Sequence, residues 1–400
     1  MRTPVTAMLV TVVVALSGCT PAATPSSSTE PSGTAAPTIS ATAAASVARV
    51  SPAASPTGSP SPSPVTMLAS GLPMPDCAPA APDSSDTIAF VASGHAWALS
   101  PTGHLTCLFA IADTGPFRWG PLGDRALLGG LEVKGVAGGP SVEGSDTSFA
   151  TIEWSRPTGK SIVYAPTDGA SLLKAPVDGS PTSDVTPLPD STYLSVTYHP
   201  SGEALAFAVE RSDGQSIWIS TNVGKTPRRL VFSEEGNQFG AIGFDVDGKH
   251  LVYAAQHVDD DHADLHIIDV GDPTKAPVLW SGPKGQRILD IQPGPTTGAV
   301  SWTTGTSCRD RVAMAHTRDG NVGALPDVEE PTMALGWLDS TQLLVATGGC
   351  DALLDLSAVD VSTGAVVPLV SGVSAAAVRT PVPTPPAPLP RTAIKGSGFS

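Results

Sequence analysis

Basic side chains are scarce in this sequence. Its 400 residues include 22 Lys and Arg against 37 Asp and Glu, which gives a formal net charge of −15. Proteins that bind nucleic acid present a basic patch to the phosphate backbone. The charge balance therefore argues against nucleic acid as a partner, and we expect a monomer.

Motifs of the common catalytic sites are also missing. The chain has no Gly-x-Ser-x-Gly elbow, no His-Glu-x-x-His helix, no phosphate-binding Gly-rich loop and no dinucleotide fingerprint. It has no Cys-x-x-Cys pair, so redox catalysis and a zinc ribbon lack support. We expect a protein that is not an enzyme and that needs no cofactor beyond the divalent cation considered below.

Long apolar runs are limited to one short segment near the N-terminus. Arg2 is followed by the mostly apolar residues 8–16, and small residues lead directly into Cys19. This order is typical of a secretory signal, and the run is too short to span a bilayer. The alternative is an ordinary thiol beside a buried helix, but no amphipathic period supports a helix.

The Leu-Ser-Gly-Cys sequence that ends at Cys19 resembles the lipobox of bacterial lipoproteins. The resemblance implies a signal peptide over residues 1–18 and a diacylglycerol, with acyl chains such as palmitate, on the Cys19 thiol. Two acyl chains give stable membrane anchoring. We therefore expect a lipoprotein on the extracytoplasmic face of the cell membrane.

Two segments have the composition of disordered chain. Residues 20–66 contain only two charged side chains and consist almost wholly of Ala, Pro, Ser, Thr and Gly, and residues 380–400 are rich in proline. Such segments bury too little apolar surface to offset their chain entropy. We expect the lipidated cysteine and a disordered linker over residues 19–70, a folded domain over 71–379 and a disordered tail over 380–400.

A repeat runs through the region between these segments. Each copy has an aromatic or apolar residue, a short polar turn that usually contains Gly, and an apolar run of four to eight residues. The central residues, spaced by 35 to 47 positions, are Trp119, Trp154, Tyr198, Phe244, Ile291 and Trp337. Gly-containing turns of a second kind interleave with them, so each copy predicts four short strands. This period is typical of β-propeller blades.

Residues 199–220 are the clearest copy, with His-Pro-Ser-Gly-Glu, an apolar strand, and then Ser-Ile-Trp-Ile-Ser. They resemble the WD40-like propellers of the TolB type, and the likeness covers nearly all of the region between the tails. It implies an all-β propeller, and many such domains bind other proteins. The chain departs from true WD40 repeats because it lacks Trp-Asp at its strand ends.

The first repeat supplies three strands, over residues 87–91, 95–99 and 105–109, with no strand before them. Residues 372–378 lie where a further first strand would start, so we expect them to complete the first blade and close the ring. Seven four-stranded blades over residues 86–378 then average about 42 residues each. Six or eight blades stay open as alternatives, because residues 129–150 hold only a vague hairpin.

Four cysteines remain besides Cys19, and an even number in an exported chain favours two disulfides over reduced, buried thiols. Cys308 and Cys350 each follow the second strand of consecutive blades, where equivalent loops lie close together. We expect these two to pair, which leaves Cys77 to pair with Cys107.

The sharpest polar cluster, residues 257–266, lies between the second and third strands of the fifth blade. Imidazoles and carboxylates at short spacing bind divalent cations, and the candidate ligands are His257, Asp261, His262, Asp264 and His266. A third strand that starts near Asp264 would leave His262 in the loop. The alternative is a solvated acidic loop that protects a strand edge.

Two functions fit these observations. The first is a lipid-anchored binding module for a protein or an envelope polymer. The second is an envelope glycan hydrolase, which needs two carboxylates near the propeller axis. Candidates for that pair are Glu153, Glu210 and Asp290, whose alternative role is that of solvated or strand-capping charges.

Overall fold

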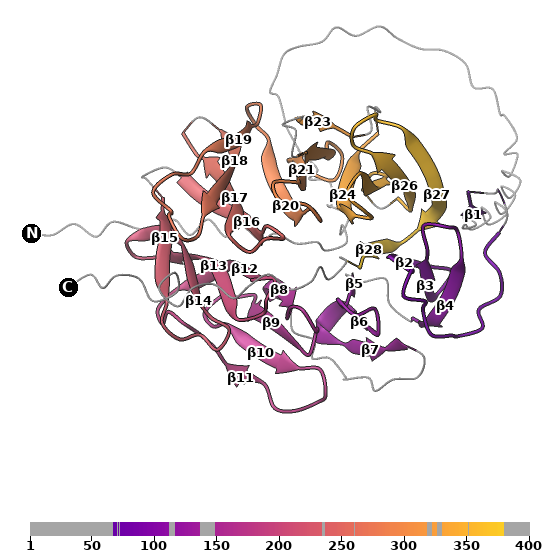
Figure 1. The fold of residues 1–400 in the computed structure, drawn as a ribbon, viewed down its shortest axis with the longest axis horizontal. Coiled ribbons are helices and arrows are strands. Elements are labelled where there is room, and N and C mark those ends of the chain that lie inside the picture. Colours follow the sequence, from indigo (N-terminus) through magenta and orange to yellow (C-terminus); the bar gives the residue numbers. More distant parts are fainter. Residues whose placement is uncertain are drawn as a thin grey trace, which may run out of the picture. The chain divides into compact units, whose positions relative to one another are not determined.

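Seven antiparallel sheets stand around a central axis and form a seven-bladed propeller (Figure 1). This computed structural model describes residues 67–69, 71, 73–111, 117–136, 149–233, 237–259, 261–317, 322–325, 330–350 and 352–379. The predicted signal peptide, most of the linker and the Pro-rich tail lie outside the described residues. The all-β fold and the seven blades are confirmed.

Each blade is built from antiparallel strands that follow one another outward from the axis. In that order, the strands are β28 (Ala375–Val378), β2 (Ile88–Ala92), β3 (His95–Leu99) and β4 (Leu105–Ala110) in blade 1; β5 (Arg118–Trp119), β6 (Arg125–Leu127) and β7 (Val133–Gly135) in blade 2; β8 (Phe149–Trp154), β9 (Ser161–Pro166), β10 (Leu173–Pro176) and β11 (Ser183–Asp184) in blade 3; β12 (Thr192–Tyr198), β13 (Ala204–Arg211), β14 (Gly214–Thr221) and β15 (Arg228–Phe232) in blade 4; β16 (Asn237–Phe244), β17 (His250–His257), β18 (His262–Asp269) and β19 (Val278–Ser281) in blade 5; β20 (Arg287–Pro293), β21 (Val300–Gly305), β22 (Val312–His316) and β23 (Val322–Ala324) in blade 6; and β24 (Thr332–Trp337), β25 (Gln342–Thr347), β26 (Leu354–Asp360) and β27 (Val366–Val373) in blade 7. One short 3-10 helix, η1 (Gly129–Leu131), lies between β6 and β7.

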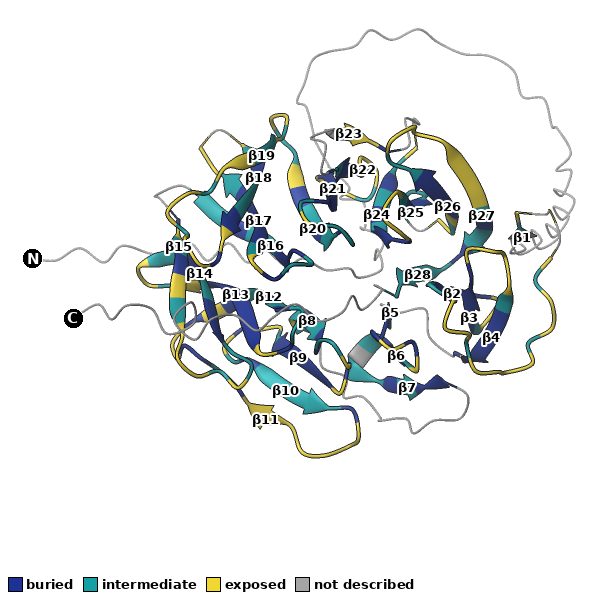
Figure 2. Cartoon of the chain, viewed as in Figure 1, coloured by how far each residue is buried: buried dark blue, intermediate teal, exposed yellow. Residues whose placement is uncertain are grey.

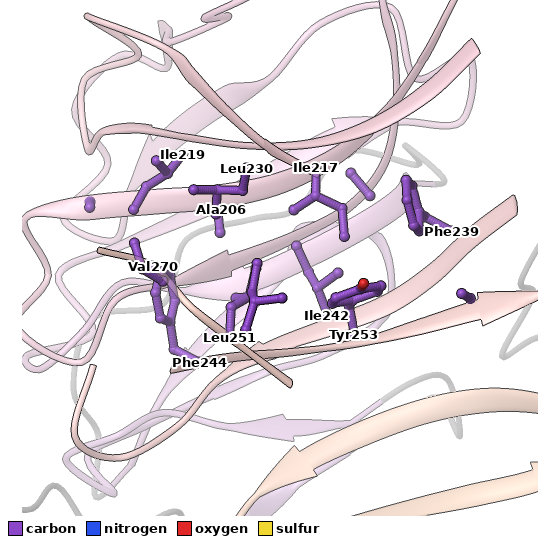
Figure 3. Packing of buried hydrophobic residues seen from close by; sticks show 14 residues of the cluster. Ala206, Ile217, Ile219, Leu230, Phe239, Ile242, Phe244, Leu251, Tyr253 and Val270 are labelled. Atoms are coloured by element: carbon purple, nitrogen blue, oxygen red, sulfur yellow. The ribbon is translucent and has the colours of Figure 1, made fainter. Parts of the chain in front are cut away.

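The hydrophobic cores lie between blades. The second strands β2 and β21 are buried at every residue, because both faces of a blade are covered by its neighbours. Figure 2 shows this burial on the inner strands and exposure on outer strands such as β11 and β27. In one core, Ile217 and Ile219 of blade 4 meet Leu251 and Tyr253 of blade 5 (Figure 3). Continuous apolar runs in the sequence therefore mark strands that are buried on two sides.

The C-terminal strand closes the ring, as the sequence predicts. Strand β28 pairs with β2 along the register Ile88↔Val378 to Val91↔Ala375. At the other end of the described chain, β1 (Met67–Leu68) adds a fifth strand to blade 7 by pairing with β27. This pairing lies within the segment 19–70 that the sequence assigns to the linker, because main-chain pairing at a sheet edge leaves no mark in composition.

One position of the repeat is corrected by the strand register. Pro293 pairs with Val300, as Trp337 pairs with Leu343, whereas Ile291 pairs with Trp302 further inside the blade. The central residue of blade 6 is therefore Pro293 and not Ile291. This position carries proline in place of the large apolar residue, which hides it from a search for such residues.

The turn glycines of the repeat let neighbouring blades approach. Gly202 and Gly248 have φ of +78° and +68°, and a Cβ atom would lie 1.9 Å from the Arg156 carbonyl oxygen at the first and 2.1 Å from His199 Nε2 at the second. The His199 ring, which is 1 % exposed, fills this contact. Its Nε2 donates to the Gly248 carbonyl at 3.0 Å, while Nδ1 lies 2.7 Å from the Ser201 hydroxyl.

We expect His199 to make the propeller less stable in acid. Burial lowers the pKa of His199 below its usual value of 6.5. The unfolded chain then binds a proton that the folded chain does not, so the free energy of unfolding falls as the pH drops below about 6.5, by up to about 1.4 kcal/mol per pH unit. The measurement is the melting temperature between pH 7 and pH 5, which should fall less steeply in His199→Gln. Equal slopes in the two proteins would contradict this role.

Candidate functional site

Charged side chains from separate blades gather at the inner strands. Arg118 lies on β5 and Glu153 on β8, and Arg118 Nη1 is 3.8 Å from Glu153 Oε2. Arg156 Nη2 lies 3.6 Å from the other carboxylate oxygen of Glu153. Glu153 is thus held between two guanidinium groups in a half-buried position.

Asp290 brings a second carboxylate to the axis from β20 of blade 6. Its Oδ1 accepts the backbone N–H of Thr303 at 2.9 Å. Burial raises the pKa of Asp290 to about 6, against the opposing effects of the Thr303 hydrogen bonds and of the charges of Arg311 and Arg118. The charge of Arg118 is the smallest of these effects, and blades 2 and 6 are not neighbours in the ring (Figure 1). Arg118, Glu153 and Asp290 thus lie on the innermost strands of blades 2, 3 and 6, and we call them the axial cluster.

Irregular pairing of the inner strands helps to place these residues. The register between the first and second strands shifts in blades 3 to 7, including the step from Ile288 to Asp290 in β20. Such a bulge bends the strand and re-aims the side chains beside it. Asp290 follows the bulge directly, and its carboxylate reaches the backbone of Thr303 on β21.

The three carboxylates predicted as hydrolase candidates are not brought together. Glu153 and Asp290 lie on inner strands, but Glu210 is exposed near the end of β13, the second strand of blade 4. Glu210 is therefore not an axial residue. Glu210 lies on a second strand, away from the turn that marks each repeat, so the sequence did not show whether it lies at the axis.

Arg118 was missed by the sequence reasoning, although a signal exists. Arg118 and Glu153 each stand directly before the central aromatic residue of the repeat, Trp119 and Trp154. Those aromatic residues are buried between blades, and the side chain before each of them lies on the opposite face of its strand. The repeat could thus have shown that the two residues occupy equivalent positions in adjacent blades.

The hairpin of β17 and β18 gathers three of the five candidate metal ligands. One ligand atom from each of His257, His262 and Asp264 lies within 4.8 Å of the others. Strand β18 begins at His262, and His262 pairs with His257 across the hairpin. Cross-strand pairing therefore extends the third strand two residues before Asp264, so His262 belongs to the strand.

The other two candidate ligands lie outside this group. His266 follows on the same face of β18, with Nε2 4.0 Å from Asp264 Oδ2. Asp261 has a φ of +53°, and its backbone carbonyl accepts the N–H of Gly285. Asp261 therefore shapes the turn, and its carboxylate does not join His257, His262 and Asp264 in the group.

A second cluster of ligand-type side chains, Asp245, Asp247 and His250, lies at the turn between β16 and β17. Asp245 Oδ2 accepts the N–H of Gly298 in blade 6 at 2.8 Å, and Asp247 Oδ1 accepts the N–H of Lys249 at 2.8 Å. These carboxylates are used by the turn and by the contact between blades.

Two disulfides join Cys77 to Cys107 and Cys308 to Cys350, with Cα atoms 5.4 Å and 5.2 Å apart. These are the pairs that the positions of the cysteines in the blades indicate. The second disulfide connects the loop after β21 to the loop after β25, which ties blades 6 and 7 together. Among the described residues, no helix combines the length and the apolar character that a membrane crossing needs.

Comparison with known proteins shows a similarity of fold alone. No protein-family profile and no curated protein matches the chain. A solved prolyl endopeptidase is 13% identical with a TM-score of 0.50, over 74% of this chain and 50% of that one. TolB from Acinetobacter baumannii is 11% identical with a TM-score of 0.41 (74% of this chain, 67% of that one), and a TolB protein of Agrobacterium tumefaciens is 16% identical with a TM-score of 0.44 (58% and 86%). This chain spans half the length of the endopeptidase, and the likeness to it shows the fold alone.

Proposed function

We propose that this protein is a binding module, held outside the membrane by lipid on Cys19, which takes a protein or an envelope polymer at the axial cluster. The observation that carries the proposal is the ion pair of Arg118 and Glu153 between the inner strands of blades 2 and 3, with Asp290 on the inner strand of blade 6. All three side chains are partly exposed and stand on inner strands, so a ligand that enters at the axis could contact them.

An arginine beside the cluster has unused hydrogen-bonding capacity. Arg311, whose charge acts on Asp290, has a buried Nε with no hydrogen-bond partner in the described protein. A buried donor left unpaired costs about 1–3 kcal/mol. A bound acceptor group, such as a carboxylate or a sugar hydroxyl, would satisfy a donor of this kind.

The propeller offers such a ligand a rigid surface. The ring is closed by its own C-terminal strand and crossed by two disulfides. Little order then has to be imposed at binding, which favours affinity. Disulfides also form and persist mainly outside the cytoplasm, in keeping with the proposed location.

Substitution of Asp290 tests the axial site. We expect Asp290→Asn, which keeps the side-chain shape and removes the charge, to reduce ligand capture by cross-linking on intact cells about tenfold. The matched control is Glu210→Gln, since Glu210 is an exposed carboxylate away from the axis. Equal capture by wild type, control and Asp290→Asn would refute the axial site.

A hydrolase acting on envelope glycans is the second candidate, and the pKa of Asp290 is the observation that favours it. A carboxyl with a pKa of about 6 suits a general acid. Glu153, the second axial carboxylate, is paired with Arg118 and Arg156, which suits a structural or binding role better than nucleophilic attack. Shortening of purified envelope glycan by wild type, abolished in Asp290→Asn, would decide for the hydrolase.

Replacement of Cys19 by Ala tests the membrane anchor separately. The variant cannot accept a thioether-linked lipid, so we expect it to move from the membrane fraction to the soluble fraction. Fractionation of cells followed by immunoblotting measures this, with the double variant Cys308→Ser/Cys350→Ser as the control that removes cysteines elsewhere in the chain. Unchanged retention of Cys19→Ala in the membrane fraction would argue against the anchor while leaving the axial site untouched.

A further inference from the structure

The outer half of blade 5 carries an imidazole and carboxylate group that the axial site does not use. His257 and His262 face each other across the β17–β18 hairpin, with ring centroids 4.4 Å apart and ring planes 10° from parallel. Asp264 lies two residues further along β18, on the same face as His262. His257 Nε2 is 3.0 Å from Asp264 Oδ2, and His262 Nε2 is 3.6 Å from Asp264 Oδ1.

The Asp264 carboxylate is incompletely satisfied. Asp264 is only 7% exposed, and its Oδ1 is buried with no hydrogen-bond partner in the described protein. Buried polar atoms are almost always paired, and an unpaired one calls for an explanation such as an ion. This oxygen lies on the side of the carboxylate that faces His262.

We propose that His257, His262 and Asp264 bind one divalent transition-metal ion of the zinc class. Bonds of about 2.0–2.2 Å in tetrahedral geometry place ligand atoms about 3.3 Å apart. The three ligand atoms already lie within 4.8 Å of one another, so small side-chain rotations complete the site. Two imidazoles and one carboxylate favour zinc, nickel, copper or cobalt over magnesium and calcium, which prefer oxygen ligands.

His266 supports the site from the next position along β18. Its Nδ1 donates to the Ala276 carbonyl at 3.1 Å, which leaves the Nε2 lone pair 4.0 Å from Asp264 Oδ2. The ring also stacks on Tyr253, with centroids 4.9 Å apart. A histidine whose outer nitrogen is fixed by a carbonyl is the usual arrangement around bound metals. Through its Nε2 lone pair, His266 can accept a hydrogen bond from a metal-bound water beside Asp264.

The His257 Nε2 that lies 3.0 Å from Asp264 is the atom that would face the metal. An imidazole binds a metal through the lone pair of a neutral ring nitrogen. Three protein ligands leave the fourth position open to water or to a partner's side chain.

Titration with zinc and cobalt tests the site. The full-length protein, purified without a histidine tag and stripped with chelator, is titrated with ZnCl2 by calorimetry and with CoCl2 by visible absorption. We expect one equivalent of zinc with a Kd of about 1 μM or tighter, a tetrahedral cobalt spectrum, and a melting temperature several degrees higher with zinc. His262→Gln should weaken binding at least tenfold, and so should His257→Gln. With two variants, the test holds even when one of them folds poorly.

His250→Gln is the matched control, because His250 lies beside two aspartates at the other end of the same strand. It should bind zinc as tightly as wild type does. The proposal is overturned if wild type binds no zinc below about 1 mM. It is also overturned if binding survives both His257→Gln and His262→Gln, or if His250→Gln alone abolishes it.

Discussion

A chain that ends at Ser374 is expected to unfold at least 8 °C below the full-length protein. The truncation removes β28, which supplies the inner strand of blade 1 through four backbone pairs with β2. It also removes Ala377 from the core shared with blade 2 and Val378 from the core shared with blade 7. Removal of a whole strand should lower the free energy of unfolding by more than about 4 kcal/mol, a value that is already exceptional for a single substitution. The melting temperature of a domain of this size falls by about 2 °C per kcal/mol.

Blade 7 approaches strand β28 closely at Gly336. A Cβ atom at Gly336 of β24 would lie 3.1 Å from Cβ of Val378, so blade 7 is shaped to receive β28. The matched control ends at Arg379 and keeps every strand described above. Thermal melting followed by circular dichroism compares the three chains. If the chain ending at Ser374 melts with the control, closure by β28 is not what stabilises the ring.

Loss of the disulfide between Cys308 and Cys350 is expected to lower the free energy of unfolding by about 4 kcal/mol. The cross-link closes a loop with a sequence separation of 42, and the chain-entropy relation gives about this value for a loop of that length. The double variant Cys308→Ser/Cys350→Ser should therefore unfold at lower urea concentration. Because the disulfide joins equivalent loops of blades 6 and 7, we expect the loss to appear in the whole propeller and not in one loop.

Reductant provides the control for this comparison. In its presence wild type loses both disulfides and the variant loses the one between Cys77 and Cys107, so their stabilities should converge. Peptide mapping without reduction should show Cys308 linked to Cys350 in wild type. A free thiol at either position, or equal stability of the oxidised proteins, would contradict the prediction.

The candidate metal site shows where sequence reasoning stops. The spacing of residues 257–266 was enough to select the ligand types and the hairpin. The cross-strand pair His257↔His262 depends on where β17 ends and β18 begins. A shift of one residue in that register would turn Asp264 to the opposite face. From the sequence alone, Asp261 and His266 were therefore candidate ligands on the same footing as the three residues that come together.

The sequence by itself determined the propeller, the hairpins and the strand that closes the ring. Each of these rests on local patterns, because a turn glycine and an apolar run act on the backbone within a few residues. Tertiary structure decided which charges meet. Arg118 and Glu153 form an ion pair because the inner strands of blades 2 and 3 stand side by side in the closed ring. No local period encodes such a contact between blades, which is why the ion pair became visible only in the folded chain.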